Sequence, residues 1–148
     1  EGNPAAIAFP RAHVANAAYN FSFSGMKSAV LNYLNSCQMK GVEIIQADVA
    51  ASFQQAVIDV LLGNIEKALN ETGCKKFALA GGVASNKTLR KAVEEACIKN
   101  GVVFYCPSPV LCTDNAAMIG AAAYYDYISG VRSDLRLNAV PNLKLGEK

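Results

Sequence analysis

Residues Lys76-Phe-Ala-Leu-Ala-Gly-Gly-Val-Ala-Ser-Asn86 form a short apolar run followed by a pair of glycines, the most informative pattern in the chain. The apolar run, residues 77–80, has the length and composition of a buried strand in a parallel sheet. A helical pattern of apolar residues follows over residues 86–100. We therefore predict a strand, a loop and a helix, in that order.

The two glycines, Gly81 and Gly82, lie where the predicted strand ends. Glycine can adopt positive φ and has no Cβ to block a group that lies on the backbone. In open α/β sheets ligands bind at this edge, where helix N-termini offer free N–H groups. The pair indicates either the floor of a ligand site or a tight turn between strand and helix.

Further strands are predicted on both sides of this unit. Residues 102–105 form a second short apolar run, and strand, helix and strand in succession predict a right-handed parallel crossover. Residues 21–25 alternate aromatic and hydroxyl side chains, which predicts a strand that is buried on one face and ends at Gly25. The expected fold is α/β with a central, mostly parallel sheet.

Helices are predicted from apolar residues that recur every three or four positions. The helix that precedes the central strand is expected to stop at Thr72-Gly73. The last helix contains almost only small and apolar residues, which predicts that it is buried against other backbone. The predicted helices cover about residues 26–35, 46–70, 86–100 and 115–129.

Composition predicts one globular domain. The chain has 148 residues, of which 52% are apolar and 18% charged, a balance typical of a packed core. No apolar run reaches the roughly 18 to 20 residues that a membrane span needs, and no signal-like segment opens the chain. We therefore expect a cytoplasmic protein. A net charge of +2 is too small to indicate nucleic-acid binding.

The cysteines number five, an odd count, and no pair has the spacing of a zinc knuckle or a redox motif. We predict that all five are reduced and that most are buried as small apolar side chains. They are Cys37, Cys74, Cys97, Cys106 and Cys112.

Two isolated basic residues, His13 and Lys27, are candidates for a site. The only histidine, His13, has no partner at helical or hairpin spacing, so a surface or capping role is expected. Lys27 falls in a predicted first helical turn, where a cation is unfavourable. That position indicates either full exposure, which we expect, or an anionic partner.

The helix predicted over residues 86–100, which follows Gly81 and Gly82, carries a cluster of charges. Arg90 precedes Glu94, and Lys91 precedes Glu95, at the spacing of helical ion pairs. Two such pairs predict a solvated face. A contact with a phosphate backbone stays open as the alternative, because this helix begins beside the glycines.

Asp114 precedes the last predicted helix. It has two interpretations: an N-cap that accepts N–H bonds from the first turn, or a carboxylate ligand to a metal at the same sheet edge. One carboxylate does not make a transition-metal site, which usually needs about three protein ligands.

Four motifs together resemble a known family. They are Phe21-Ser-Phe-Ser-Gly-Met-Lys27, Asp48-Val-Ala-Ala-Ser-Phe-Gln54, Ala80-Gly-Gly-Val-Ala-Ser-Asn86 and Cys112-Thr-Asp-Asn-Ala-Ala-Met118. In this order the chain resembles the carboxyl-terminal half of the tRNA threonylcarbamoyladenosine transferases, formerly called O-sialoglycoprotein endopeptidases or glycoproteases. The likeness runs to Pro141 and favours the bacterial branch.

The resemblance implies a fold shared with actin, hexokinase and the heat-shock ATPases, in which two α/β lobes enclose a nucleotide. Residues 1–148 would form the carboxyl-terminal lobe, and the other lobe, with a His-x-x-x-His metal pair, would lie outside this chain. The tail, residues 132–148, could add an edge strand or be disordered.

The resemblance also implies site residues. Gly81 and Gly82 would support an adenylate, Asn86 would hydrogen-bond it, and Asp114 would be a ligand to iron or zinc. Threonylcarbamoyl would move from its adenylate to the exocyclic amine of an adenosine beside the tRNA anticodon. No residue of this half is expected to act as a nucleophile or general base.

The same resemblance sets expectations for partners. The partners of the whole protein would be threonylcarbamoyl-adenylate, tRNA and accessory tRNA-modification subunits. This chain alone would be inactive, with at most a weak adenine-nucleotide site, and would self-associate as a dimer. Two alternatives are a metal-dependent glycoprotease, against which the chain has no His-Glu-x-x-His, and a non-catalytic nucleotide-binding module.

Overall fold

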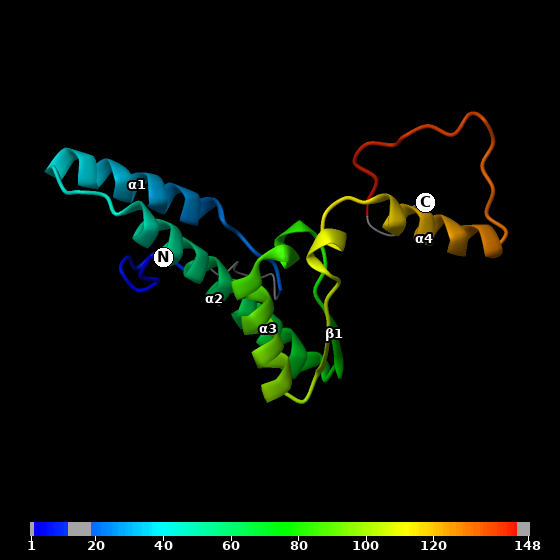
Figure 1. Ribbon diagram of the computed structural model, residues 1–148, viewed down its shortest axis with the longest axis horizontal. Helices are drawn as coiled ribbons and strands as arrows, with labels where there is room; N and C mark the ends of the chain where they lie inside the picture. The colour runs from blue at the N-terminus through cyan, green and yellow to red at the C-terminus, as the bar shows by residue number, and fades with distance from the viewer. Residues whose placement is uncertain (1, 12–18, 145–148) are drawn as a thin grey trace. The chain divides into compact units, whose positions relative to one another are not determined.

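The computed structural model describes residues 2–11 and 19–144. His13 lies outside these residues. The chain divides into two compact units, a larger one of residues 1–112 and a smaller one of residues 113–148, which are considered separately. Both are drawn in Figure 1.

Helix α2, Gln46–Thr72, is the scaffold of the larger unit. It ends at Gly73, whose φ of 65° places it in the left-handed region, so the predicted stop signal is confirmed. Two clusters of buried side chains lie along α2. The first contains Ile58, Leu69, Leu89, Val93, Cys97 and Val102, and the second contains Phe9, Met26, Ala56 and Val60.

The predicted strand, helix and strand are present. Strand β1, Lys76–Ala78, pairs in parallel with β2, Val103–Tyr105, and α3, Lys87–Lys99, connects them (Figure 1). Phe77 and Phe104 are partners in the register, and both pack on the first cluster.

The strands are shorter and less buried than predicted. In each three-residue strand only the central phenylalanine is half-buried, and both its neighbours are exposed. Only one face of the pair is covered, because α3 and α2 pack on the side of the phenylalanines. Within the described residues the sheet has these two parallel strands. This is compatible with the predicted α/β class, but the sheet is smaller than the central sheet that was predicted.

The strand predicted at residues 21–25 is wrong. Helix α1, Ser24–Lys40, begins there and runs longer than the predicted 26–35. Instead of pairing with a strand, Phe21 and Phe23 stack on each other with ring centroids 6.2 Å apart. Burial of Met26 against α2 orders the first turn of α1.

In the smaller unit, helix α4, Ala116–Ile128, matches the predicted bounds but not the predicted burial. None of its residues is buried, because the described part of this unit contains one helix followed by turns and extended chain, which cannot cover it. The edge strand was one of two alternatives for the tail, and residues 132–144 contain no strand. No helix in the described residues is long and apolar enough to cross a membrane.

Candidate functional site

The glycine loop leaves β1 through a conformation that requires glycine. Gly81 has φ 90° and ψ 171°, a region essentially restricted to glycine. The chain then forms a short 3₁₀ turn, η1, over Gly82–Ser85, in which the Ser85 hydroxyl donates to the Gly82 carbonyl at 2.6 Å. Chain neighbours aside, a Cβ at either glycine would meet no heavy atom of the described residues within 4 Å, so these residues leave the space over this backbone open.

Asn86 ends the loop and caps α3. Its Oδ1 accepts a hydrogen bond from the Leu89 amide at 3.0 Å, and its Nδ2 donates to Gln54 Oε1 at 3.0 Å. Gln54 in turn donates through Nε2 to the Thr88 hydroxyl at 3.3 Å. These bonds fix the orientation of the Asn86 amide. Nδ2 carries two N–H groups, and the bond to Gln54 uses only one of them.

A small cavity of about 290 Å³ lies beside Asn86, between α2 and α3. Its lining is mainly apolar, with amide groups from Gln54 and Asn86. Binding sites for small molecules commonly combine an apolar wall with a few oriented polar groups. The apolar lining comes from Ala50, Phe53, Val57, Ile58, Leu61, Val83 and Leu89.

Arg90 does not form the predicted ion pair with Glu94. Its side chain turns toward two loops, donating through Nε to the Ala84 carbonyl and through Nη2 to the Pro107 carbonyl at 2.6 Å. Nη2 also lies 3.0 Å from Cys112 Sγ. The second predicted pair, Lys91 with Glu95, is present at 3.9 Å on the exposed face.

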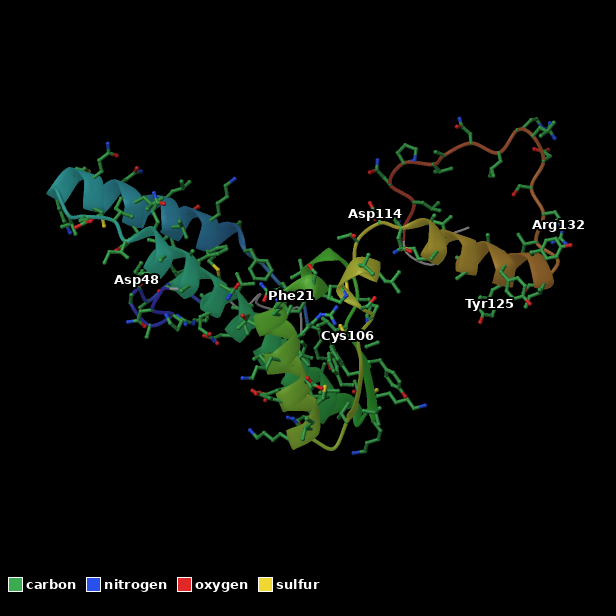
Figure 2. The ribbon with its side chains drawn as sticks, in the orientation of Figure 1. Phe21, Asp48, Cys106, Asp114, Tyr125 and Arg132 are labelled. Atoms are coloured by element: carbon green, nitrogen blue, oxygen red, sulfur yellow. The ribbon has the colours of Figure 1, made fainter. Side chains whose placement is uncertain are left out.

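Asp114, labelled in Figure 2, is exposed and belongs to the smaller unit. It is not the N-cap of α4, so that interpretation is wrong. The cap is Asn115, whose Oδ1 accepts from the Met118 amide at 2.9 Å. The metal-ligand interpretation of Asp114 stays a prediction.

The family model for TsaD, tRNA N6-adenosine threonylcarbamoyltransferase, matches residues 1–121, which include the glycine loop, Arg90 and Asp114. The chain belongs to the TsaD family. The family resemblance seen in the four motifs is thereby confirmed.

Curated relatives agree with this assignment. Proteins named tRNA N6-adenosine threonylcarbamoyltransferase are 59% identical in Clostridium botulinum strain Hall, 57% in Clostridium beijerinckii and 56% in Clostridium novyi. Each match covers 100% of this TsaD-family chain but 44% of the relative. The chain thus spans less than half the length of the curated relatives it matches.

The described residues of this TsaD-family chain do not complete a metal site. No group of three or more His, Cys, Asp or Glu side chains lies together among them. The five cysteines are free thiols, as predicted, with Cys37, Cys97 and Cys112 buried. Burial raises the pKa of the Cys106 thiol, although the nearby Arg90 guanidinium acts in the opposite direction.

Two residues of the candidate site were missed. Gln54 lies in a quoted motif, yet its bond to Asn86 joins residues 32 positions apart and leaves no local pattern. The spacing of Arg90 to Glu94 suits an ion pair and predicts a solvated face, which hides its contacts with the two loops. Lys27 is exposed, as expected, at the edge of an apolar cavity of about 910 Å³ between α1 and α2.

Proposed function

We propose that this chain is part of an enzyme that transfers threonylcarbamoyl from threonylcarbamoyl-adenylate to the exocyclic amine of an adenosine beside the tRNA anticodon. The observation that carries the proposal is the name shared by curated relatives, which are 56–59% identical over the whole of this chain. The small parallel sheet with helices is compatible with the carboxyl-terminal lobe of an actin-like fold.

The adenylate is proposed to lie on the glycine loop. Gly81 and Gly82 expose bare backbone with open space above it, which suits close approach of an oxygen-rich group. Asn86 would donate an Nδ2 N–H to the ligand, with its amide oriented by Gln54. The apolar cavity beside Asn86 suits part of a purine ring.

Catalysis by these residues would consist of binding and orientation, because fixed geometry lowers the entropic barrier to transfer. Asp114 is proposed as one ligand of an iron or zinc ion whose other ligands lie elsewhere in the whole protein. No catalytic step is assigned to that ion, since the described donor set does not hold it alone. The proposed location is the cytoplasm, with accessory tRNA-modification subunits bound to the whole protein.

For the chain alone we expect no transfer activity and at most weak nucleotide binding. Half of a nucleotide cleft could supply a Kd near 1 mM, about −4 kcal/mol. The whole protein should modify tRNA when given threonylcarbamoyl-adenylate. Absence of modification, together with cleavage of casein or glycophorin that a chelator abolishes, would instead support the old glycoprotease name.

The decisive first experiment is calorimetric titration of AMP into this chain with and without ferrous iron or zinc. Asn86→Ser keeps a cap acceptor but removes the amide donor, so it should abolish the heat of binding. Asn115→Ser makes the same change at the α4 cap and should leave binding unchanged. Asp114→Ala should alter only the metal-dependent part of the signal.

The outcomes of this titration separate two descriptions of the chain. Equal loss of binding in both serine variants would contradict a nucleotide role for Asn86. No binding by any form, with transfer intact in the whole protein, would mean that the nucleotide cleft requires residues outside this chain.

A further inference from the structure

Arg90 joins two loops of the larger unit, the glycine loop over residues 81–86 and the loop over residues 106–112. It lies in the first turn of α3, is half-buried, and donates to Ala84, Pro107 and Cys112. These acceptors are 6, 17 and 22 positions away, so one side chain connects segments that the sequence separates. We call this set the Arg90 clasp.

The glycine loop held by the clasp carries proposed site residues, and the second loop ends two residues before Asp114. Ala84 is in the 3₁₀ turn that starts at Gly82, and its side chain is buried. Cys112, 5% exposed, ends the segment that leads by two residues to Asp114. A displacement of the Arg90 guanidinium should therefore disturb both the glycine loop and the chain just before Asp114.

The chemistry of the clasp requires arginine. A guanidinium presents five N–H donors in a rigid plane, so it can serve acceptors on two loops at fixed angles. A lysine ammonium is a compact charge on a flexible stem and cannot hold the same directions. Among the described ion pairs none includes Arg90, so its geometry is set by these three acceptors rather than by a carboxylate.

We propose that Arg90 is a positioning residue for the transfer reaction: it fixes the glycine loop against residues 107–112 of the larger unit. This inference rests on the proposed function and adds a residue to it. Arg90 acts through the backbone of the two loops and need not touch the substrate.

The kinetic test uses the whole protein that carries this chain. Arg90→Met keeps the stem and removes all donors, Arg90→Lys keeps the charge, and Lys91→Met is the matched control on the exposed face of the same helix. Rates are divided by the concentration of folded protein and are measured at a temperature well below the midpoint of thermal unfolding of each variant. Arg90→Met should lower kcat/KM for tRNA modification about 100-fold, the effect of misplacing reacting groups by about 1 Å.

The conservative variants sharpen this result. Arg90→Lys should recover less than about one tenth of the lost kcat/KM, since one ammonium cannot reproduce the guanidinium geometry. Lys91→Met should stay within about twofold of wild type, because an exposed ion pair contributes little. A wild-type kcat/KM in folded Arg90→Met would overturn the inference, and so would full recovery in Arg90→Lys.

A second measurement, amide hydrogen exchange on this 148-residue chain, needs no activity. In Arg90→Lys the protected amides of residues 84–86 and 111–112 should exchange about tenfold faster together, as expected from lost hydrogen bonds to a charged group. Amides in the middle of α2 should keep their protection. Faster exchange in only one of the two loops, or equally throughout α2, would overturn the clasp as a positioning device.

The two tests fail in different ways. If wild-type protein does not modify tRNA, the proposed function fails, while the exchange measurement still decides whether Arg90 orders both loops. If wild type is active and the Arg90 variants lose only thermal stability, the function stands and the positioning role is wrong.

Discussion

Helices α3 and α4 each contain 13 residues, and each follows an asparagine whose side chain accepts a hydrogen bond from the third residue on. Their burial differs completely. In α3 the residues Leu89, Val93, Ala96 and Cys97 are buried, and all but Ala96 belong to the first cluster with side chains of α2 and the strands. Helix α4 has no buried residue. The more apolar of the two helices is thus the less covered.

The difference shows that length and capping do not settle whether a helix is buried. The amphipathic pattern of α3 needs one covering face, which α2 provides. A helix that is apolar on all sides needs neighbours all around, and the described residues of the smaller unit offer it only turns and extended chain.

The largest contrast should come from truncating one apolar side chain in each helix. Leu89→Ala removes a buried side chain and should lower the free energy of unfolding by about 2–5 kcal/mol, because it leaves a cavity in the first cluster. Ile119→Ala in α4, where the side chain is 64% exposed, should change it by less than about 0.5 kcal/mol. Urea denaturation of both variants measures this, and similar losses would contradict the comparison.

The next largest effect concerns association. Because α4 exposes its apolar side chains, we expect the chain to form dimers at high concentration through this helix. Ile119→Lys should weaken dimerisation about tenfold or more, corresponding to about 1.4 kcal/mol. Met39→Lys, at an exposed position in α1, is the control. Sedimentation equilibrium gives the constants, and a monomeric wild type would contradict the prediction.

The caps should differ by a smaller amount. Asn86→Ala removes a cap whose amide also bonds Gln54, and should destabilise the larger unit by about 1–2 kcal/mol. Asn115→Ala removes the same kind of cap from a helix without buried contacts, so α4 should fray while the larger unit keeps its stability. Thermal unfolding with residue-resolved hydrogen exchange separates these results. A lower stability of the larger unit in the Asn115→Ala variant would contradict this expectation.

The smallest contrast is in pH dependence. In the larger unit the Tyr19 hydroxyl donates to the Glu71 carboxylate at 2.7 Å, which raises the pKa of Tyr19. The contribution of this hydrogen bond to the free energy of unfolding is complete at neutral pH. It is lost as pH rises past about 10, since the unfolded tyrosine ionises first. Tyr19→Phe should flatten the alkaline limb of a stability–pH curve, and an unchanged limb would contradict this.

The smaller unit should respond at the opposite end of the pH scale. Hydrogen bonds from Arg136 lower the pKa of Asp134, so this contribution is complete above about pH 4 and is lost as pH falls through the lowered value. Both groups are exposed, so the effect should be small. NMR titration of the Asp134 carboxyl measures it, and Arg136→Gln should return the pKa toward its ordinary range.

Local chemistry made much of the fold predictable. The stop at Gly73, the strand, helix and parallel strand around α3, and the bounds of α4 follow from periodicity and glycine conformation. The prediction of a strand at residues 21–25 was wrong because an alternation of aromatic and hydroxyl residues forms a strand only where a neighbouring strand can pair with it. The candidate site could be predicted in part. Gly81 has the predicted positive φ, but the bond of Gln54 to Asn86 could not be predicted, because it depends on the packing of α2 against α3.

Motifs, caps and apolar spacing involve a few neighbouring residues, so the family and most of the local elements could be recognised from the sequence alone. Which polar side chains face each other depends on how distant segments pack. Arg90 shows the reason: at the spacing of an ion pair with Glu94, it bonds instead to carbonyls and a thiol 6 to 22 residues away. Several directed hydrogen bonds in a half-buried place outweigh one exposed ion pair, and burial is a property of the assembled fold.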